Sequence, residues 1–211
     1  VSVTYEAVSS SLKKVYLTPD QKHHVLKKFG LRQPFVVYTG NVYPHKNVDL
    51  LIEAVAQHNR EKETDLQLAL ICSRSVFWDR LNKKIKDKNL GNWIKMLGYL
   101  DDKLVSEIYS LSLVLVHPSK MEGFGLTGLE AMSLGLPVIS SNTSCLPEVY
   151  GDAAFFFNPN SVGDLVEKLE QLIKDVDLRK RLIASGYHQV GKYSWERMGK
   201  ETIEVYRNLL K

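Results

Sequence analysis

Residues 113–140 read LVLVHPSKMEGFGLTGLEAMSLGLPVIS. An apolar run over residues 113–116 is followed by a glycine-rich loop, a short helical pattern over residues 129–134, and a second apolar run over residues 137–140. Short runs that are apolar throughout are typical of strands with both faces covered. A strand, a helix and a strand in this order predict a parallel pair joined by a crossover.

The same alternation extends in both directions along the chain. We expect further strands over residues 35–39, 66–71, 94–97 and 153–157. Apolar positions recur at helical spacing between them, over residues 48–55, 76–88 and 104–109. Apolar strands that alternate with helices predict an α/β fold, a Rossmann-like doubly wound parallel sheet of about six strands.

The two ends of the chain lack this alternation. Residues 1–34 predict a linker, in which residues 1–5 alternate as at the end of a strand and residues 19–29 form a short helix. Residues 35–193 hold the domain itself. Residues 194–211 predict a C-terminal helix that reaches beyond the sheet.

The composition is that of an ordinary globular protein. Hydrophobic residues make up 44% of the 211 residues, and no apolar run reaches the roughly 18 residues of a membrane span. The net charge of +4 permits an anionic ligand but does not indicate nucleic acid, because the positive residues are not gathered into one block, and we expect no nucleic-acid partner. Two cysteines favour a reducing compartment. The first residues do not resemble a signal peptide. Because the chain starts without Met, we expect a fragment of a longer protein.

Ligands of a doubly wound sheet bind beyond the carboxyl ends of its strands, so the loops that follow the strands are the candidates. In residues 40–47, Gly40 permits a tight turn and Lys46 stands just before a helix, within reach of an anion. A solvated lysine is the competing interpretation. The glycine spacing fits neither a P-loop nor a GxGxxG motif, which disfavours a Walker ATPase and a standard dinucleotide site.

The loop over residues 119–132 carries more signals. Three glycines within residues 123–128 let the backbone approach a ligand, and the helix that follows offers free N–H groups, so we expect a phosphate site. Glu122 and Glu130 would repel phosphate and are expected to accept hydrogen bonds from sugar hydroxyls. A glycine-rich connection with two solvated glutamates is the alternative.

Other polar features receive structural interpretations. Asp175-Val176-Asp177 has the form of a metal-binding DxD motif, but its place between two amphipathic stretches predicts that Asp177 caps a helix. We expect no metal site. His117 ends a strand at the ligand edge, where a structural role and a ligand contact are both open. The lysines of residues 83–88 predict a solvated helix face, with a membrane contact left open.

Several motifs in order resemble glycosyltransferases of the GT-B fold. Glu122 and Glu130 have the E-x7-E spacing of that class, and residues 130–140, EAMSLGLPVIS, are similar to a run found in glycosyltransferase family 4. Residues 146–154, LPEVYGDAA, and residues 40–47, GNVYPHKN, resemble two further motifs of that family. The resemblance covers the whole chain. It implies the C-terminal, donor-binding half of a retaining, metal-independent transferase.

The resemblance also implies roles for single residues. Lys46 would contact the donor diphosphate, Glu130 the ribose hydroxyls and Glu122 the hydroxyls of the donor sugar, so Lys46 and Glu122 are the expected catalytic residues. Tyr99 would lie against the nucleobase. The other expected donor-binding residues are Gly40, Asn41, Gly123, Phe124, Gly125, Leu126 and Thr127.

Two of these positions depart from the family. Asn41 stands where many members have arginine, and Thr127 where many have proline. The missing arginine leaves the compensation of phosphate charge open.

The implied reaction moves a hexosyl group from a nucleoside-diphosphate sugar, of the GDP-mannose or UDP-glucose type, to an acceptor hydroxyl. The product would belong to polysaccharide, lipopolysaccharide or glycolipid synthesis. A missing N-terminal lobe, toward which the C-terminal helix would reach, would bind the acceptor glycan or glycolipid, so this chain alone should bind donor and transfer little. We expect a cytoplasmic location, with a peripheral contact at the inner face of the membrane left open. A sugar-nucleotide epimerase of similar fold and a non-catalytic nucleotide-binding module are the alternatives.

Overall fold

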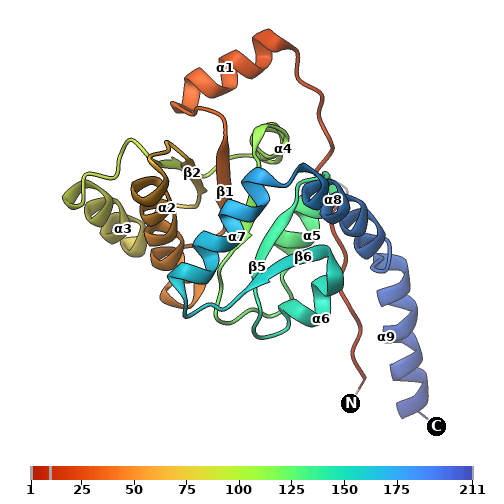
Figure 1. Cartoon of the computed structure of the whole chain (residues 1–211). Coiled ribbons are helices and arrows are strands. Elements are labelled where there is room, and N and C mark those ends of the chain that lie inside the picture. The colour runs from red at the N-terminus through yellow and green to blue at the C-terminus, as the bar shows by residue number, and fades with distance from the viewer. Residues whose placement is uncertain (1, 10, 211) are drawn as a thin grey trace.

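The computed structural model describes residues 2–9 and 11–210. Within this part of the chain, six parallel strands form one sheet with helices on both faces (Figure 1). The strands are β1 (Phe35–Thr39), β2 (Gln67–Ile71), β3 (Ile94–Gly98), β4 (Val114–His117), β5 (Val138–Ser141) and β6 (Ala154–Phe157). The predicted doubly wound parallel sheet is therefore confirmed.

Helices connect these strands and continue beyond the last one. They are α1 (Pro19–Phe29), α2 (Val48–Lys62), α3 (Val76–Asp87), α4 (Asp102–Leu111), α5 (Leu126–Ser133), α6 (Leu146–Tyr150), α7 (Val162–Lys174), α8 (Val176–Val190) and α9 (Trp195–Leu209). Two short 3-10 turns are η1 (Pro44–Lys46) and η2 (Gly151–Ala153).

The central strand shows why the sheet needs helices on both faces. Val36 and Tyr38 pack into the apolar cluster formed with α2, α3 and α7. Phe35 and Val37, which point the other way, pack into the cluster formed with α4, α5 and α6. All four side chains are almost fully buried. Each contributes about 1.5–3 kcal/mol of hydrophobic free energy, so neither layer of helices is dispensable.

The strand order places the ligand edge. The strands lie in the order β3-β2-β1-β4-β5-β6, so the chain builds outward from β1 to one side and then returns to build outward on the other. The order reverses between β1 and β4, and the loops after these two strands therefore open a crevice at the carboxyl edge. These are the loops over residues 40–47 and 118–125.

Three local expectations differ from the structure. Residues 2–9 form no strand and Val1 lies outside the described residues; this segment is held by side chains instead, with the Tyr5 hydroxyl donating to Glu148. Helix α5 begins at Leu126, three residues before the first apolar position that indicated it. Helix α6 was not expected, because five residues are too few to establish a helical period.

Candidate functional site

Backbone and amide hydrogen bonds join the two loops at the crevice. Turn η1 ends at Lys46, and Asn47 follows in the left-handed conformation with φ 57°. The Asn47 side-chain amide donates to the carbonyls of Pro118 at 3.1 Å and Pro159 at 2.9 Å. The Lys120 amide donates to the carbonyl of His45 at 2.8 Å. Lys46 is therefore presented by a loop that is tied to the ends of both β4 and β6.

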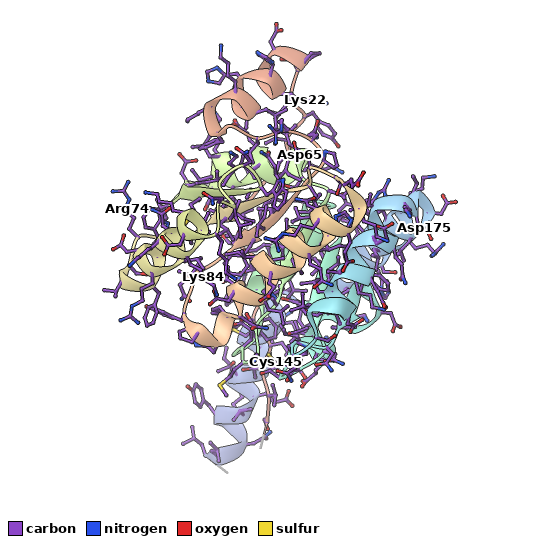
Figure 2. All side chains as sticks on the ribbon, turned by 60° about the vertical axis from the view of Figure 1, so that its left-hand side comes forward. Lys22, Asp65, Arg74, Lys84, Cys145 and Asp175 are labelled. Atoms are coloured by element: carbon purple, nitrogen blue, oxygen red, sulfur yellow. The ribbon has the colours of Figure 1, made fainter. Side chains whose placement is uncertain are left out.

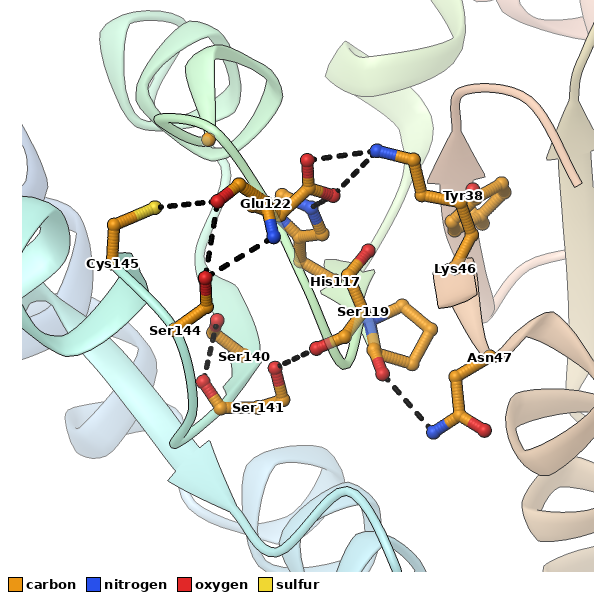
Figure 3. A network of polar contacts seen from close by, with 12 residues as sticks. Tyr38, Lys46, Asn47, His117, Ser119, Glu122, Ser140, Ser141, Ser144 and Cys145 are labelled. Carbon is orange, nitrogen blue, oxygen red and sulfur yellow. Dashed lines mark hydrogen bonds and ion pairs between the residues drawn. The ribbon is translucent and has the colours of Figure 1, made fainter. Parts of the chain in front are cut away.

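An ion pair connects the two predicted catalytic residues. The Lys46 Nζ lies 2.7 Å from both carboxylate oxygens of Glu122 (Figure 3). The two side chains are only 19% and 11% exposed. Burial disfavours the charged form of Glu122, but hydrogen bonds from His117 and Lys46 outweigh it and lower the pKa of Glu122 to about 2. Glu122 is thus ionised at neutral pH.

His117 connects Glu122 to the interior. Its Nε2 lies 2.8 Å from Glu122 Oε1, and its Nδ1 lies 2.7 Å from the Tyr150 hydroxyl. That hydroxyl donates in turn to the carbonyl of Gly125 at 2.6 Å. Burial, followed by the nearby Glu122 charge, raises the pKa of Tyr150 well above its ordinary value, so the hydroxyl keeps its proton. This chain of contacts with buried groups fixes the position of the Glu122 carboxylate.

The loop after β5 holds the backbone of the same residue. The Ser144 hydroxyl accepts from the Glu122 amide at 3.2 Å and lies 3.0 Å from its carbonyl oxygen, to which it donates (Figure 3). The Cys145 thiol donates to the same carbonyl at 3.4 Å. Both the side chain and the backbone of Glu122 are therefore fixed before any ligand arrives.

The glycine-rich loop leads directly into α5. Gly125 adopts φ 98°, a left-handed conformation that favours glycine, and the helix starts at the next residue. The amides of Leu126 and Thr127 lie in the first turn, where they have no acceptor within the helix. The side chain of Phe124, just before this turn, packs on the ring of Tyr193, with ring centroids 5.6 Å apart. An anion could be held by these backbone N–H groups, and the phosphate site stays a prediction.

Glu130 lies one turn into α5 and is half-buried. Within residues 2–9 and 11–210 its carboxylate makes no hydrogen bond or ion pair, which leaves its oxygens available to a ligand. Burial, and then the charge of Asp102 at the start of α4, raises the pKa of Glu130 above its ordinary value. Tyr99 follows β3 and is 78% exposed at the same edge.

The predicted site residues fall on loops at the carboxyl edge of the sheet or at the start of α5, except Glu130, which lies one turn into that helix. Gly40 and Asn41 follow β1, and Gly123 lies in the loop after β4. Of the predicted set, the structure brings Lys46 and Glu122 into direct contact. Among the described residues, no hydrogen bond or ion pair joins Tyr99 or Glu130 to this pair.

The DxD sequence caps a helix, as expected, but through a different residue. Asp175, not Asp177, is the N-cap of α8, and its carboxylate accepts from the Leu178 amide at 2.7 Å. The cap position belongs to Asp175 because α8 begins at Val176, two residues earlier than its apolar pattern indicated. Asp175 lies away from the rim that carries Cys145 (Figure 2). Across residues 2–9 and 11–210, His, Cys, Asp and Glu form no group of three suited to a metal ion.

Residues 20–189 match the model of the family described as glycosyl transferases group 1. The chain belongs to the glycosyl transferases group 1 family. Among its relatives, O-antigen chain mannosyltransferase B of Escherichia coli is 36% identical over 188 residues, which cover 88% of this chain and 49% of that protein. This group 1 glycosyltransferase chain thus spans about half the length of that relative.

Solved structures agree on the fold. A glycosyltransferase from Rickettsia africae has a TM-score of 0.84 and 22% identity, covering 100% of this chain and 57% of that one. The Anabaena protein Alr3699/HepE, solved in complex with UDP and glucose, has a TM-score of 0.80 and 20% identity, covering 100% and 56%. These proteins have the GT-B fold, so the group 1 chain carries the Rossmann-like architecture of that class.

Four residues of the site were missed or left undecided by sequence reasoning. His117 was open between two roles, and its place at the end of a strand was the available signal. Asn47, Ser144 and Tyr150 gave no signal, because their contacts join segments that are distant in the chain.

In the described residues, no helix is both long and apolar enough to traverse a bilayer.

Proposed function

We propose that this chain is the donor-binding part of a glycosyltransferase that takes a hexosyl group from a nucleoside-diphosphate sugar. The observation that carries the proposal is the pair of Lys46 and Glu122 beside the start of α5. A cation and free helix N–H groups suit a diphosphate, while a fixed carboxylate suits the hydroxyls of a sugar. The crevice therefore offers complementary groups to both the diphosphate and the sugar of the donor.

The proposed chemistry centres on charge. As the bond between the sugar and the diphosphate breaks, negative charge grows on the leaving group, and Lys46 and the α5 N-terminus would stabilise it. Glu122 would fix the sugar. We propose retention at the anomeric carbon, with the acceptor attacking from the face that the diphosphate leaves and the diphosphate accepting its proton, and without a metal.

The donor and acceptor belong to the same proposal. The 36% identity to a mannosyltransferase of O-antigen chains favours GDP-mannose and a polysaccharide acceptor. UDP-glucose is the competing donor, favoured by the UDP and glucose bound to a protein of the same fold. The acceptor would be bound by a second lobe, so we propose that this chain alone binds donor and transfers little. We place this activity in the cytoplasm, with a peripheral contact at the membrane.

Parallel calorimetric titrations test the donor. The chain is titrated with GDP-mannose and with UDP-glucose at the same concentration, and mannose 1-phosphate serves as the control without a nucleotide. We expect saturable binding of one nucleotide sugar at least 10-fold tighter than of the other. Absence of binding by both nucleotide sugars would overturn the proposed function.

A further inference from the structure

The hydrogen bonds from Glu122 to Tyr150 constrain where His117 carries hydrogen. A tyrosine hydroxyl has one hydrogen, and Tyr150 gives it to the Gly125 carbonyl, which is only an acceptor. The contact between Tyr150 and His117 Nδ1 therefore requires a hydrogen on that nitrogen. Ionised Glu122 is also only an acceptor, so His117 Nε2 must carry a hydrogen as well.

We propose that His117 is a positioning residue of the donor site, a doubly protonated imidazole that bridges Tyr150 to Glu122. The imidazolium holds one oxygen of the carboxylate at 2.8 Å, while Lys46 contacts both. Glu122 consequently keeps one orientation toward the crevice. The part of this inference that concerns the donor rests on the proposed function, whereas the protonation state does not.

The charge balance of the cluster follows from this assignment. One carboxylate, Glu122, is shared by two cations, Lys46 and His117, which leaves a net charge of +1. Ordinary ion-pairing of Lys46 with Glu122 would leave the crevice neutral. The His117 side chain, which carries the extra positive charge, is only 7% exposed. Water and salt therefore screen this charge weakly, and it attracts an anion in the crevice.

The glycine-rich loop makes room for the anchor of this bridge. Tyr150 is fully buried, and a Cβ atom on Gly128 would lie 2.3 Å from its ring and hydroxyl. A Cβ atom on Gly125 would lie 2.7 Å from the same hydroxyl. Both glycines therefore have a second role besides letting the backbone approach a ligand. Because they have no side chain, the Tyr150 hydroxyl can lie where it accepts a hydrogen bond from His117.

Nuclear magnetic resonance on the ligand-free chain tests the protonation state. With 15N-labelled histidine at neutral pH, we expect both ring nitrogens of His117 to carry hydrogen. In Tyr150→Phe, which keeps the ring and removes only the hydroxyl, Nδ1 loses its acceptor and we expect the neutral form to appear. A neutral His117 in the unmodified chain would overturn the inference, whatever the chain binds.

Donor titration tests the positioning role. We expect His117→Gln to weaken binding of the nucleotide sugar about 10-fold and Tyr150→Phe to weaken it about 3-fold. The matched control is His58→Gln, because His58 is also buried, bonds Glu170 at 3.0 Å and Thr64 at 3.2 Å, and lies near Pro34 and Leu66 at the amino ends of β1 and β2.

The outcomes are distinct. Unchanged affinity in both His117→Gln and Tyr150→Phe, or an equal loss in His58→Gln, would contradict the positioning role. If His117→Gln does not fold, Tyr150→Phe decides alone. If the unmodified chain binds neither nucleotide sugar, the proposed function fails together with the donor role of His117, and the resonance experiment still decides its charge.

Discussion

At the scale of single residues, Glu130 is the carboxylate that the protein itself leaves available. Glu122 is held by Lys46, His117 and Ser144, whereas the Glu130 carboxylate has no hydrogen-bond partner in the described part of the chain. A group of this kind, half-buried at a ligand edge, costs free energy until a ligand supplies donors. Two ribose hydroxyls would do so.

Replacement of Glu130 tests this difference. We expect Glu130→Ala to weaken binding of the nucleotide sugar about 10-fold, the value of a charged hydrogen bond, without lowering the thermal midpoint. Calorimetry and thermal unfolding measure the two effects. Glu167→Ala, at an exposed position of α7, is the control. Unchanged donor affinity in Glu130→Ala would remove Glu130 from the donor site.

Lys46 should act on the diphosphate rather than on the sugar. We expect Lys46→Ala to weaken binding of the free nucleoside diphosphate about 10-fold or more, because one charge-assisted contact is lost and Glu122 keeps only His117 as a partner for its charge. Lys174→Ala removes an exposed lysine that pairs with Glu170 and should leave binding unchanged. Equal affinities in Lys46→Ala and the unmodified chain would exclude the diphosphate contact.

At the scale of elements, α5 can pack against Tyr150 of α6 only because Gly128 has no side chain. We expect Gly128→Ala to destabilise the protein by about 1–3 kcal/mol, because its methyl group would overlap the buried Tyr150 ring. Gly163→Ala is the matched control on α7, where a Cβ atom meets nothing within 4 Å and should stabilise the helix by about 0.5–1 kcal/mol. Urea unfolding measures both. Equal effects of the two substitutions would disprove the packing argument.

The start of α8 offers a second test at this scale. Asp175→Ala should destabilise the protein by about 1 kcal/mol, because the Leu178 amide loses its cap. Asp177→Ala removes an exposed side chain that pairs with Lys180 and should change stability by less than about 0.5 kcal/mol. Thermal unfolding of the two variants side by side compares them. A larger loss in Asp177→Ala would restore the assignment made from the sequence alone.

The elements also show what the sequence could and could not predict. Each strand was found nearly at its true bounds, because a buried parallel strand is an apolar run that the sequence displays directly. Residues 1–5 carried a strand-like alternation, but a strand needs backbone partners, and residues 2–9 have none in the structure. Lys46 and Glu122 were each predicted, but their contact depends on β1 lying next to β4, which no local pattern encodes.

At the scale of the whole molecule, α9 stands apart from the rest. None of its described residues is buried, and Trp195, Ile203 and Tyr206 are at least half exposed. Figure 1 shows it extending away from the sheet. We therefore expect a chain that ends at residue 194 to keep donor affinity within about 2-fold, as measured by calorimetry. A 10-fold loss would mean that α9 contributes to the crevice.

The strand order also has a consequence for folding kinetics. Lys46 and Glu122 are 76 positions apart in the chain, and they meet only when β4 has docked on β1. Contacts between such distant segments form late, because closing a long loop costs entropy before the contact compensates for it. An intermediate that contains β1, β2 and β3 alone would have Lys46 but no carboxylate opposite it. The crevice is therefore a property of the completed sheet, and recovery of ligand binding during refolding reports the joining of its two halves.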